Sequence, residues 1–258
     1  MRLMKRILSA AAVLALSASL LVGCSSGTAS SVPVSASSAA ESTVSSVEET
    51  ASSAVDENEA AAAQLLNDLT GSYQELWPVI LADEYQQTWL DDCTALVGEE
   101  NAEAAFEKLS SMVTSDVYGE DAVEAYANGG GAYFCGFTNS LATLTFDGET
   151  STISGTDKDG NVLFSHTYHY IGMEPVHGLY EFESDDADSG EFTYFFLAPD
   201  TSAETYHIEF RYGSDAEALS QYDAGEYAYW VASGISTDCD QTMIDNCIEL
   251  FCTENLAG

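Results

Sequence analysis

Positive charge is almost absent from this sequence. Its 258 residues include 43 Asp and Glu but only 6 Lys and Arg, which gives a formal net charge of -37. Three of the basic residues, Arg2, Lys5 and Arg6, lie at the N-terminal end. Such an acidic surface repels phosphate backbones and anionic lipids, and it raises the local concentration of cations. We therefore exclude nucleic acid as a partner.

Histidine is also scarce, with four residues in the whole chain: His166, His169, His177 and His207. No spacing of Ser, His and Asp, and no activated Cys, indicates a nucleophilic active site. His166 and His169 are three residues apart, so on a strand their side chains point to opposite faces. The sequence therefore predicts a binding protein and not an enzyme.

Residues 1–23 have the features of an export signal. A basic head is followed by the apolar run Ile7–Val22, which is too short for a membrane-spanning helix. The run ends in Leu21-Val22-Gly23-Cys24, which matches a lipobox with its Cys at the cleavage point. We expect Cys24 to become the lipidated N-terminus of a protein anchored to the extracellular face of the cell membrane.

Residues 24–58 are rich in Ser, Ala, Thr and Val and contain no aromatic side chain. Such a segment buries too little apolar surface to offset the entropy of ordering, so it predicts a flexible tether. The remaining residues, 59–258, are numerous enough to form one domain with a real core.

Five cysteines follow Cys24, namely Cys93, Cys135, Cys239, Cys247 and Cys252. An exported protein can form disulfides, but an odd number leaves at least one thiol unpaired within the monomer. We expect most of these residues to be small buried hydrophobes, with one bridge possible.

Helical patterns come first and strand patterns follow. Apolar spacing predicts helices over Glu57–Asn67, Leu81–Val97, Asn101–Val113, Asp121–Asn128 and Asp240–Thr253, the last with Asp240 as N-cap. Ser72–Val79 is expected to be extended or mixed. Strand-like runs occupy Tyr133–Asn139, Leu141–Phe146, Ser151–Gly155, Val162–Tyr170, Gly178–Phe182, Phe192–Leu197 and Thr205–Tyr212. The pattern favours a mostly β protein with helical additions, built on an antiparallel barrel or sandwich.

Two Asp-rich segments, Asp157–Asn161 and Asp186–Glu191, partly resemble calcium loops. Neither has the complete ligand pattern with a distant bidentate Glu. We interpret both as hairpin turns, in which Asp and Gly accommodate the required backbone angles.

The segment Tyr206–Phe210 followed by Tyr212–Asp215 resembles the metal strand of the ZinT (YodA-like) zinc-binding family. Further similarity to that family, in the same order along the chain, is found in Leu69–Ala82, Thr167–Gly172, Tyr180–Phe182 and Phe192–Pro199. The resemblance spans roughly Leu66 to Phe251. It implies a lipocalin-like (calycin) antiparallel β-barrel with N-terminal helices and a C-terminal helix. It also implies zinc binding by three His at the barrel mouth and an association with zinc uptake.

The sequence departs from the family pattern at the metal ligands. The family's His-x-His pair falls on Thr205-Tyr206-His207, and its third His falls near Phe195, which cannot bind metal. Glu209 lies on the same strand face as His207 by alternation. Asp200 and Glu204 are close in sequence. The candidate metal ligands are therefore His207, Glu209 and His169, with His166 and His177 as further possible donors.

The resulting hypothesis is a lipid-anchored protein that binds a divalent metal, with zinc expected, and delivers it to an uptake system such as an ABC transporter. A second hypothesis is a barrel without metal that binds a small apolar or aromatic ligand, because 14 Tyr and 11 Phe outnumber the histidines. A third is a surface interaction module with an exposed aromatic patch at Tyr222–Trp230.

Overall fold

The computed structural model describes residues 57–199 and 207–256. The predicted export signal, Cys24, nearly all of the predicted tether, Asp200 and Glu204 lie outside the described residues. Within the described ranges no helix is both long enough and apolar enough to cross a membrane.

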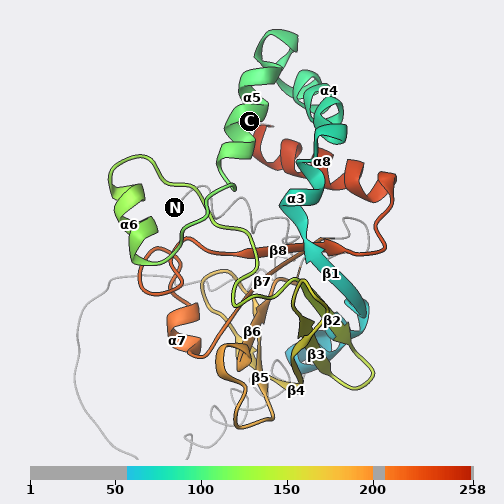
Figure 1. Cartoon of the computed structure of the whole chain (residues 1–258), viewed down its shortest axis with the longest axis vertical. Helices are drawn as coiled ribbons and strands as arrows, with labels where there is room; N and C mark the ends of the chain where they lie inside the picture. Colours follow the sequence, from blue (N-terminus) through green and yellow to red (C-terminus); the bar gives the residue numbers. More distant parts are fainter. Residues whose placement is uncertain (1–56, 200–206, 257–258) are drawn as a thin grey trace, which may run out of the picture.

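Eight strands form a closed antiparallel barrel in which each strand pairs with the next one in sequence and β8 returns to β1 (Figure 1). The strands are β1 (Gly71–Glu75), β2 (Thr143–Asp147), β3 (Thr152–Thr156), β4 (Val162–Met173), β5 (Tyr180–Ser184), β6 (Tyr194–Leu197), β7 (His207–Gly213) and β8 (Ala232–Ser236). The predicted fold class, mostly β with helical additions, is confirmed.

Aromatic side chains fill the barrel interior. Phe195 on β6 lies opposite Tyr212 on β7, and their ring centroids are 5.4 Å apart. Phe210 also stacks on Tyr212, and Phe164 on β4 stacks on Phe192 at 4.0 Å. Residues 208, 210 and 212 therefore point inward, and alternation along the strand places 207, 209 and 211 on the outer face.

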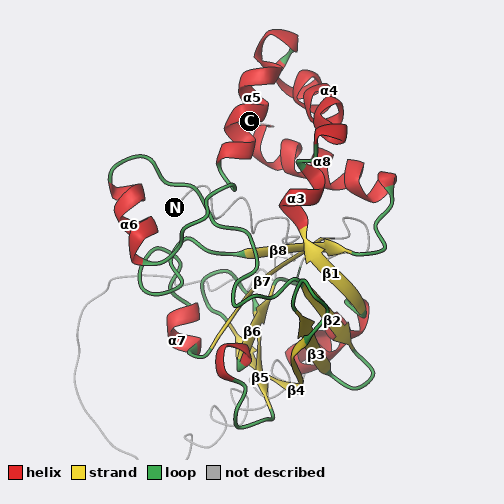
Figure 2. Ribbon diagram, in the orientation of Figure 1, coloured by secondary structure: helices red, strands yellow, loops and turns green. Residues whose placement is uncertain are grey.

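Most of the helices are inserted between β1 and β2 (Figure 2). They are α3 (Leu76–Ile80), a 3-10 helix (Asp83–Tyr85), α4 (Gln86–Val97), α5 (Glu99–Ser111) and α6 (Glu120–Ala127). After the barrel, α8 (Gln241–Leu256) packs on α4, and together with α3 and α5 it forms a helical lobe at one end of the barrel (Figure 1).

Trp89 lies at the centre of the helical lobe. Its side chain is fully buried between Phe106 and Phe251, with ring centroids 5.5 and 6.0 Å away, and its Nε1 donates to the carbonyl of Ile80 at 2.7 Å. A further helix covers residues 57–68, and α7 (Ala216–Leu219) follows β7.

Most predicted helices are confirmed, including the one that begins after Asp240, whose Oδ1 accepts a hydrogen bond from the Met243 N–H at 3.0 Å. The helix predicted from Leu81 begins only at Gln86. Leu81 instead ends α3, and the 3-10 helix at Asp83–Tyr85 separates the two helices. The segment Ser72–Val79 is mixed as expected, since β1 passes directly into α3.

One strand prediction is wrong, and one strand, β8, was not predicted. Within Tyr133–Asn139 only Phe134 forms β-bridges, to Thr114 and Trp230. The segment lies beside β8 at the point where β1 has left the barrel for α3, so its pairing is too short to form a strand. It still provides a hydrogen-bond partner for the backbone next to β8, since the Val231 N–H donates to the Phe134 carbonyl.

The Asp-rich turn and the cysteines follow the interpretations made above. Asp157 Oδ1 accepts hydrogen bonds from the backbone N–H groups of Asp159 and Asn161, each at 2.9 Å, which closes a hairpin turn. All five described cysteines are free thiols, and four of them are buried. Cys93 and Cys252 place their sulfur atoms 3.9 Å apart between α4 and α8.

Candidate functional site

His207 and Glu209 stand on the same face of β7, as alternation predicted, and that face is the outer one. His207 lies opposite Ile235 and Glu209 lies opposite Ser233 on β8. Glu209 is buried, whereas His207 is partly exposed at the first residue of the strand. The preceding segment, with Asp200 and Glu204, lies outside the described residues.

His169 lies far from His207. Across the barrel wall His169 is in register with Glu183, which is in register with Tyr194 and then Gly213. Gly213 is six residues from His207 along β7, which corresponds to about 20 Å at 3.3 Å per residue. The structure therefore places the predicted ligand His169 far from the predicted ligand His207.

His169 has two acidic neighbours of its own. Its Nδ1 lies 2.8 Å from Asp185 Oδ1, and its Nε2 lies 4.0 Å from Glu183 Oε2. About half of the imidazole surface is exposed, 52%. Glu183 also accepts a hydrogen bond from the Tyr194 hydroxyl at 3.2 Å. A carboxylate that holds one imidazole nitrogen fixes the ring and directs the other nitrogen to a ligand.

The remaining histidines occupy separate places. His166 is on the inner side of β4, where its Nδ1 lies 2.7 Å from Asp186 Oδ2 and its ring stacks on Phe164. The side chain of His177 is 8% exposed, with its ring centroid 3.8 Å from that of Tyr222 and its Nδ1 3.6 Å from Glu174 Oε2. Each histidine thus pairs with its own nearby groups.

Across residues 57–199 and 207–256 no set of three or more His, Cys, Asp and Glu side chains is placed to hold a metal ion. Phe195, at the position of the family's third His, is fully buried in the aromatic interior. The family's three-His arrangement therefore has no counterpart within these ranges.

Arg211 is the most deeply buried charge on the outer face of β7, and its role was not predicted. Its guanidinium donates to the carbonyls of Leu219, Gln221 and Tyr227, and it lies over the Tyr222 ring at 4.2 Å. Burial lowers the pKa of this guanidinium. The scarcity of basic residues was the available signal, since a single buried Arg must have partners.

Glu174 is fully buried near Arg211. Burial alone would raise the pKa of this carboxyl group. The His177 side chain and the backbone N–H groups of Val176 and His177 outweigh that effect, and they lower the pKa below its usual range. These hydrogen bonds hold the loop after β4 together.

The two alternative hypotheses both depend on where the aromatic side chains lie. Tyr222, Tyr227 and Trp230 are all buried, so the predicted exposed patch at Tyr222–Trp230 is wrong. These rings cover the outer wall and rim of the barrel and contact protein, not solvent. The stacked rings described above occupy part of the barrel interior.

A closed up-and-down barrel of eight antiparallel strands is the architecture of lipocalin-like (calycin-type) barrels. It is similar to the Zn(II)-bound ZinT-like domain of Streptococcus pneumoniae AdcA, at 15% identity and a TM-score of 0.45, over 71% of this chain and 89% of that one. It is also similar to Zn(II)-bound AdcA from Streptococcus pneumoniae, at 16% identity and a TM-score of 0.44, over 71% of this chain and 35% of that one.

No protein-family model and no curated protein matches the sequence. The first similar structure carries the name of the family that the sequence motifs resemble. The zinc in both structures is a property of those proteins.

Proposed function

We propose that the protein is a zinc-binding lipoprotein of the cell surface that captures a divalent metal ion and passes it to an uptake system. The observation that carries the proposal is the placement of His169 between Asp185 and Glu183. In this proposal the protein is a binding protein without catalytic activity.

The geometry around His169 suits zinc in two respects. Asp185 holds Nδ1, so Nε2 presents its lone pair toward Glu183. Two ligands of a tetrahedral zinc ion, each about 2.1 Å from the metal, stand about 3.4 Å apart. The observed separation of 4.0 Å needs only a small side-chain adjustment to reach that value.

Two protein ligands leave the other coordination positions to water or to a group from another molecule. A site of this kind binds more weakly than a closed structural zinc site, and its ion remains accessible for transfer. The formal charge of -37 adds a general attraction for cations. Lipidation at Cys24 would hold the site at the membrane surface, close to an ABC transporter.

His207 and Glu209 supply a second position for the same function, because the family resemblance centres on that strand. This position needs ligands beyond the two residues, and Asp200 and Glu204 are the nearest in sequence. The two positions are offset by about 20 Å along the strand direction and lie three strands apart, so mutations can distinguish them.

The proposal is tested by titrating zinc into the chain that lacks the predicted export signal. Calorimetry measures the binding. We expect saturable binding that weakens at least about tenfold in His169→Ala and in Glu183→Gln. Glu149→Gln is the matched control, because it removes one charge from an exposed turn. A loss in His207→Ala with intact binding in His169→Ala would move the site to β7. Zinc binding no tighter than calcium binding, and unchanged in every variant, would refute the function.

A further inference from the structure

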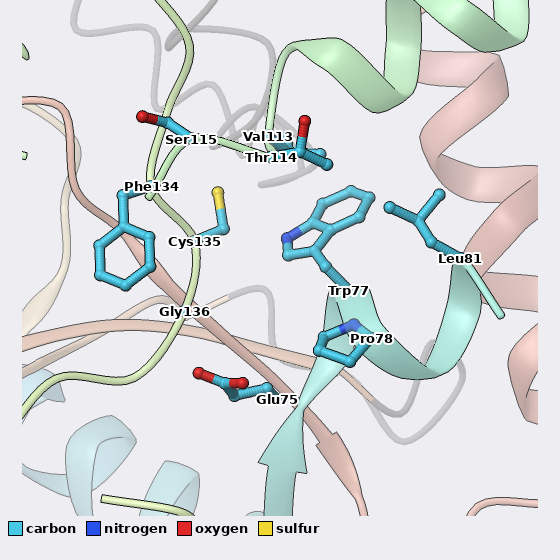
Figure 3. Close-up of a pocket in the computed structure, with 10 residues that line it drawn as sticks. All are labelled: Glu75, Trp77, Pro78, Leu81, Val113, Thr114, Ser115, Phe134, Cys135 and Gly136. Carbon is cyan, nitrogen blue, oxygen red and sulfur yellow. The ribbon is translucent and has the colours of Figure 1, made fainter. Parts of the chain in front are cut away.

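A pocket lies between the barrel and the helical lobe, where β1 ends and α3 begins (Figure 3). It has a volume of about 330 Å³. Trp77, Leu81, Val113 and Phe134 give it mostly apolar walls. The size and composition are those of a small-molecule site, and the pocket lies outside the aromatic barrel interior.

One wall carries a hydrogen-bond donor. Trp77 is 8% exposed, and within the described structure its Nε1 has the sulfur of Cys135, and no oxygen or nitrogen atom, as its hydrogen-bond partner. The nitrogen faces the sulfur of Cys135 across the pocket (Figure 3). Burial raises the pKa of the Cys135 thiol, which therefore stays neutral and is a poor acceptor. An oxygen atom of a ligand is a stronger acceptor than this neutral sulfur, so the indole N–H is suited to bind such a ligand.

The floor of the pocket carries a negative charge. Glu75, the last residue of β1, accepts a hydrogen bond from the Phe137 N–H at 2.6 Å, and it forms no ion pair within the described ranges. Its carboxylate approaches Gly136 so closely that a Cβ there would lie 2.9 Å from Oε1. The carboxylate can accept further hydrogen bonds beyond the one from Phe137.

We propose that this pocket binds a small amphipathic amine. Its apolar ring lies among Trp77, Leu81 and Phe134, its ammonium group pairs with Glu75, and an oxygen on the ring accepts from Trp77 Nε1. Charge complementarity selects the cation, because the pocket carboxylate and the acidic surface both attract positive charge. The aromatic walls favour an ammonium group further through cation–π attraction. This site is separate from the zinc position at His169 and does not depend on it, whereas Glu209 on β7 lies near enough to act on the pocket residue Cys135.

Three related probes test each feature of the pocket in the full chain. Tyramine carries the ring, the ammonium and the hydroxyl group; phenethylamine lacks the hydroxyl; 3-(4-hydroxyphenyl)propionate replaces the ammonium with a carboxylate. Calorimetry gives the affinities, and the side-chain N–H signals of the three Trp residues in NMR spectra report on the location. We expect saturable tyramine binding that shifts the Trp77 signal, weaker binding of phenethylamine and no binding of the acid.

Two variants and one control complete the test. Glu75→Gln keeps an acceptor for the Phe137 N–H but removes the charge, so tyramine should bind at least about tenfold more weakly. Glu149→Gln changes the net charge equally and should leave the affinity unchanged. Leu81→Trp should fill the pocket and abolish binding. No binding at about 10 mM tyramine, equal affinity for amine and acid, or undiminished binding in Glu75→Gln or Leu81→Trp would overturn the proposal.

Discussion

Arg211 anchors the segment after β7 to the barrel wall, and Arg211→Met tests how much that anchor contributes. The guanidinium is fully buried, and its bonds to Leu219 and Tyr227 are themselves buried. Methionine fills a similar volume but donates no hydrogen bonds. Each buried carbonyl left without a donor costs about 1–3 kcal/mol. The buried Glu174 also loses a neighbouring positive charge.

The substitution also has a favourable term, because the guanidinium no longer has to be removed from water. Removing one partner from a buried charged network usually costs about 3–5 kcal/mol in total. We expect the free energy of unfolding to fall by about 3 kcal/mol, toward the lower end of that range, because Gln221 is only part-buried.

Urea denaturation measures the loss, and amide hydrogen exchange shows where it acts. Exchange in the segment from Leu219 to Tyr229 should accelerate more than exchange in the strands. Lys108→Met is the matched control, since it removes one positive charge from an exposed position on α5. If Arg211→Met and Lys108→Met unfold within about 0.5 kcal/mol of each other, the anchoring role assigned to Arg211 is wrong.

Three further predictions concern packing, pH and thiol chemistry. Gly155→Ala should lower the free energy of unfolding by about 1–3 kcal/mol, because a Cβ would lie 2.4 Å from neighbouring side chains; an unchanged melting temperature would contradict this. The pKa of Glu174 is lowered in the folded state, so its contribution is complete above the ordinary Glu pKa of about 4.3 and is lost as pH falls below it. The stability difference between wild type and Glu174→Gln, measured by urea denaturation, should therefore shrink in acid, and a constant difference would refute the assignment. Mild oxidation should slowly cross-link Cys93 to Cys252, because the two sulfur atoms are near each other but burial raises the pKa of both thiols. Peptide mapping that finds a different pair would contradict the arrangement of α4 and α8.

The predictable part of the fold lies where aromatic and β-branched runs alternate with turn residues. Strands β4 and β7 carry that pattern over many residues. By contrast, β8 reads Ala-Ser-Gly-Ile-Ser, and its small residues give no strand signal of their own. Tyr133–Asn139 has the aromatic composition of a strand but lies at the barrel rim. In both cases, pairing with distant segments of the chain determines whether a strand forms. The local sequence carries no signal of that pairing.

The candidate sites depend even more on pairing. His169 was identified from the sequence, but its neighbours Glu183 and Asp185 follow from the register of β4 and β5. That register shifts at a bulge between Tyr170 and Gly172, and the sequence does not reveal the shift. The pocket joins Glu75 and Trp77 to Phe134 and Cys135, which are about 60 residues further along the chain. Only the closed barrel places them together.

The insertion of the helices between β1 and β2 makes β1 a separable piece of the barrel. It pairs with β2 on one side and β8 on the other, although both partners follow the helical insertion in sequence. Gly129 and Gly130 are exposed in the connection after α6. A cut there would leave one fragment with β1 and the inserted helices, and a second with the other seven strands. We expect the two fragments to reassemble without a covalent link, so the chain is suited to use as a split reporter.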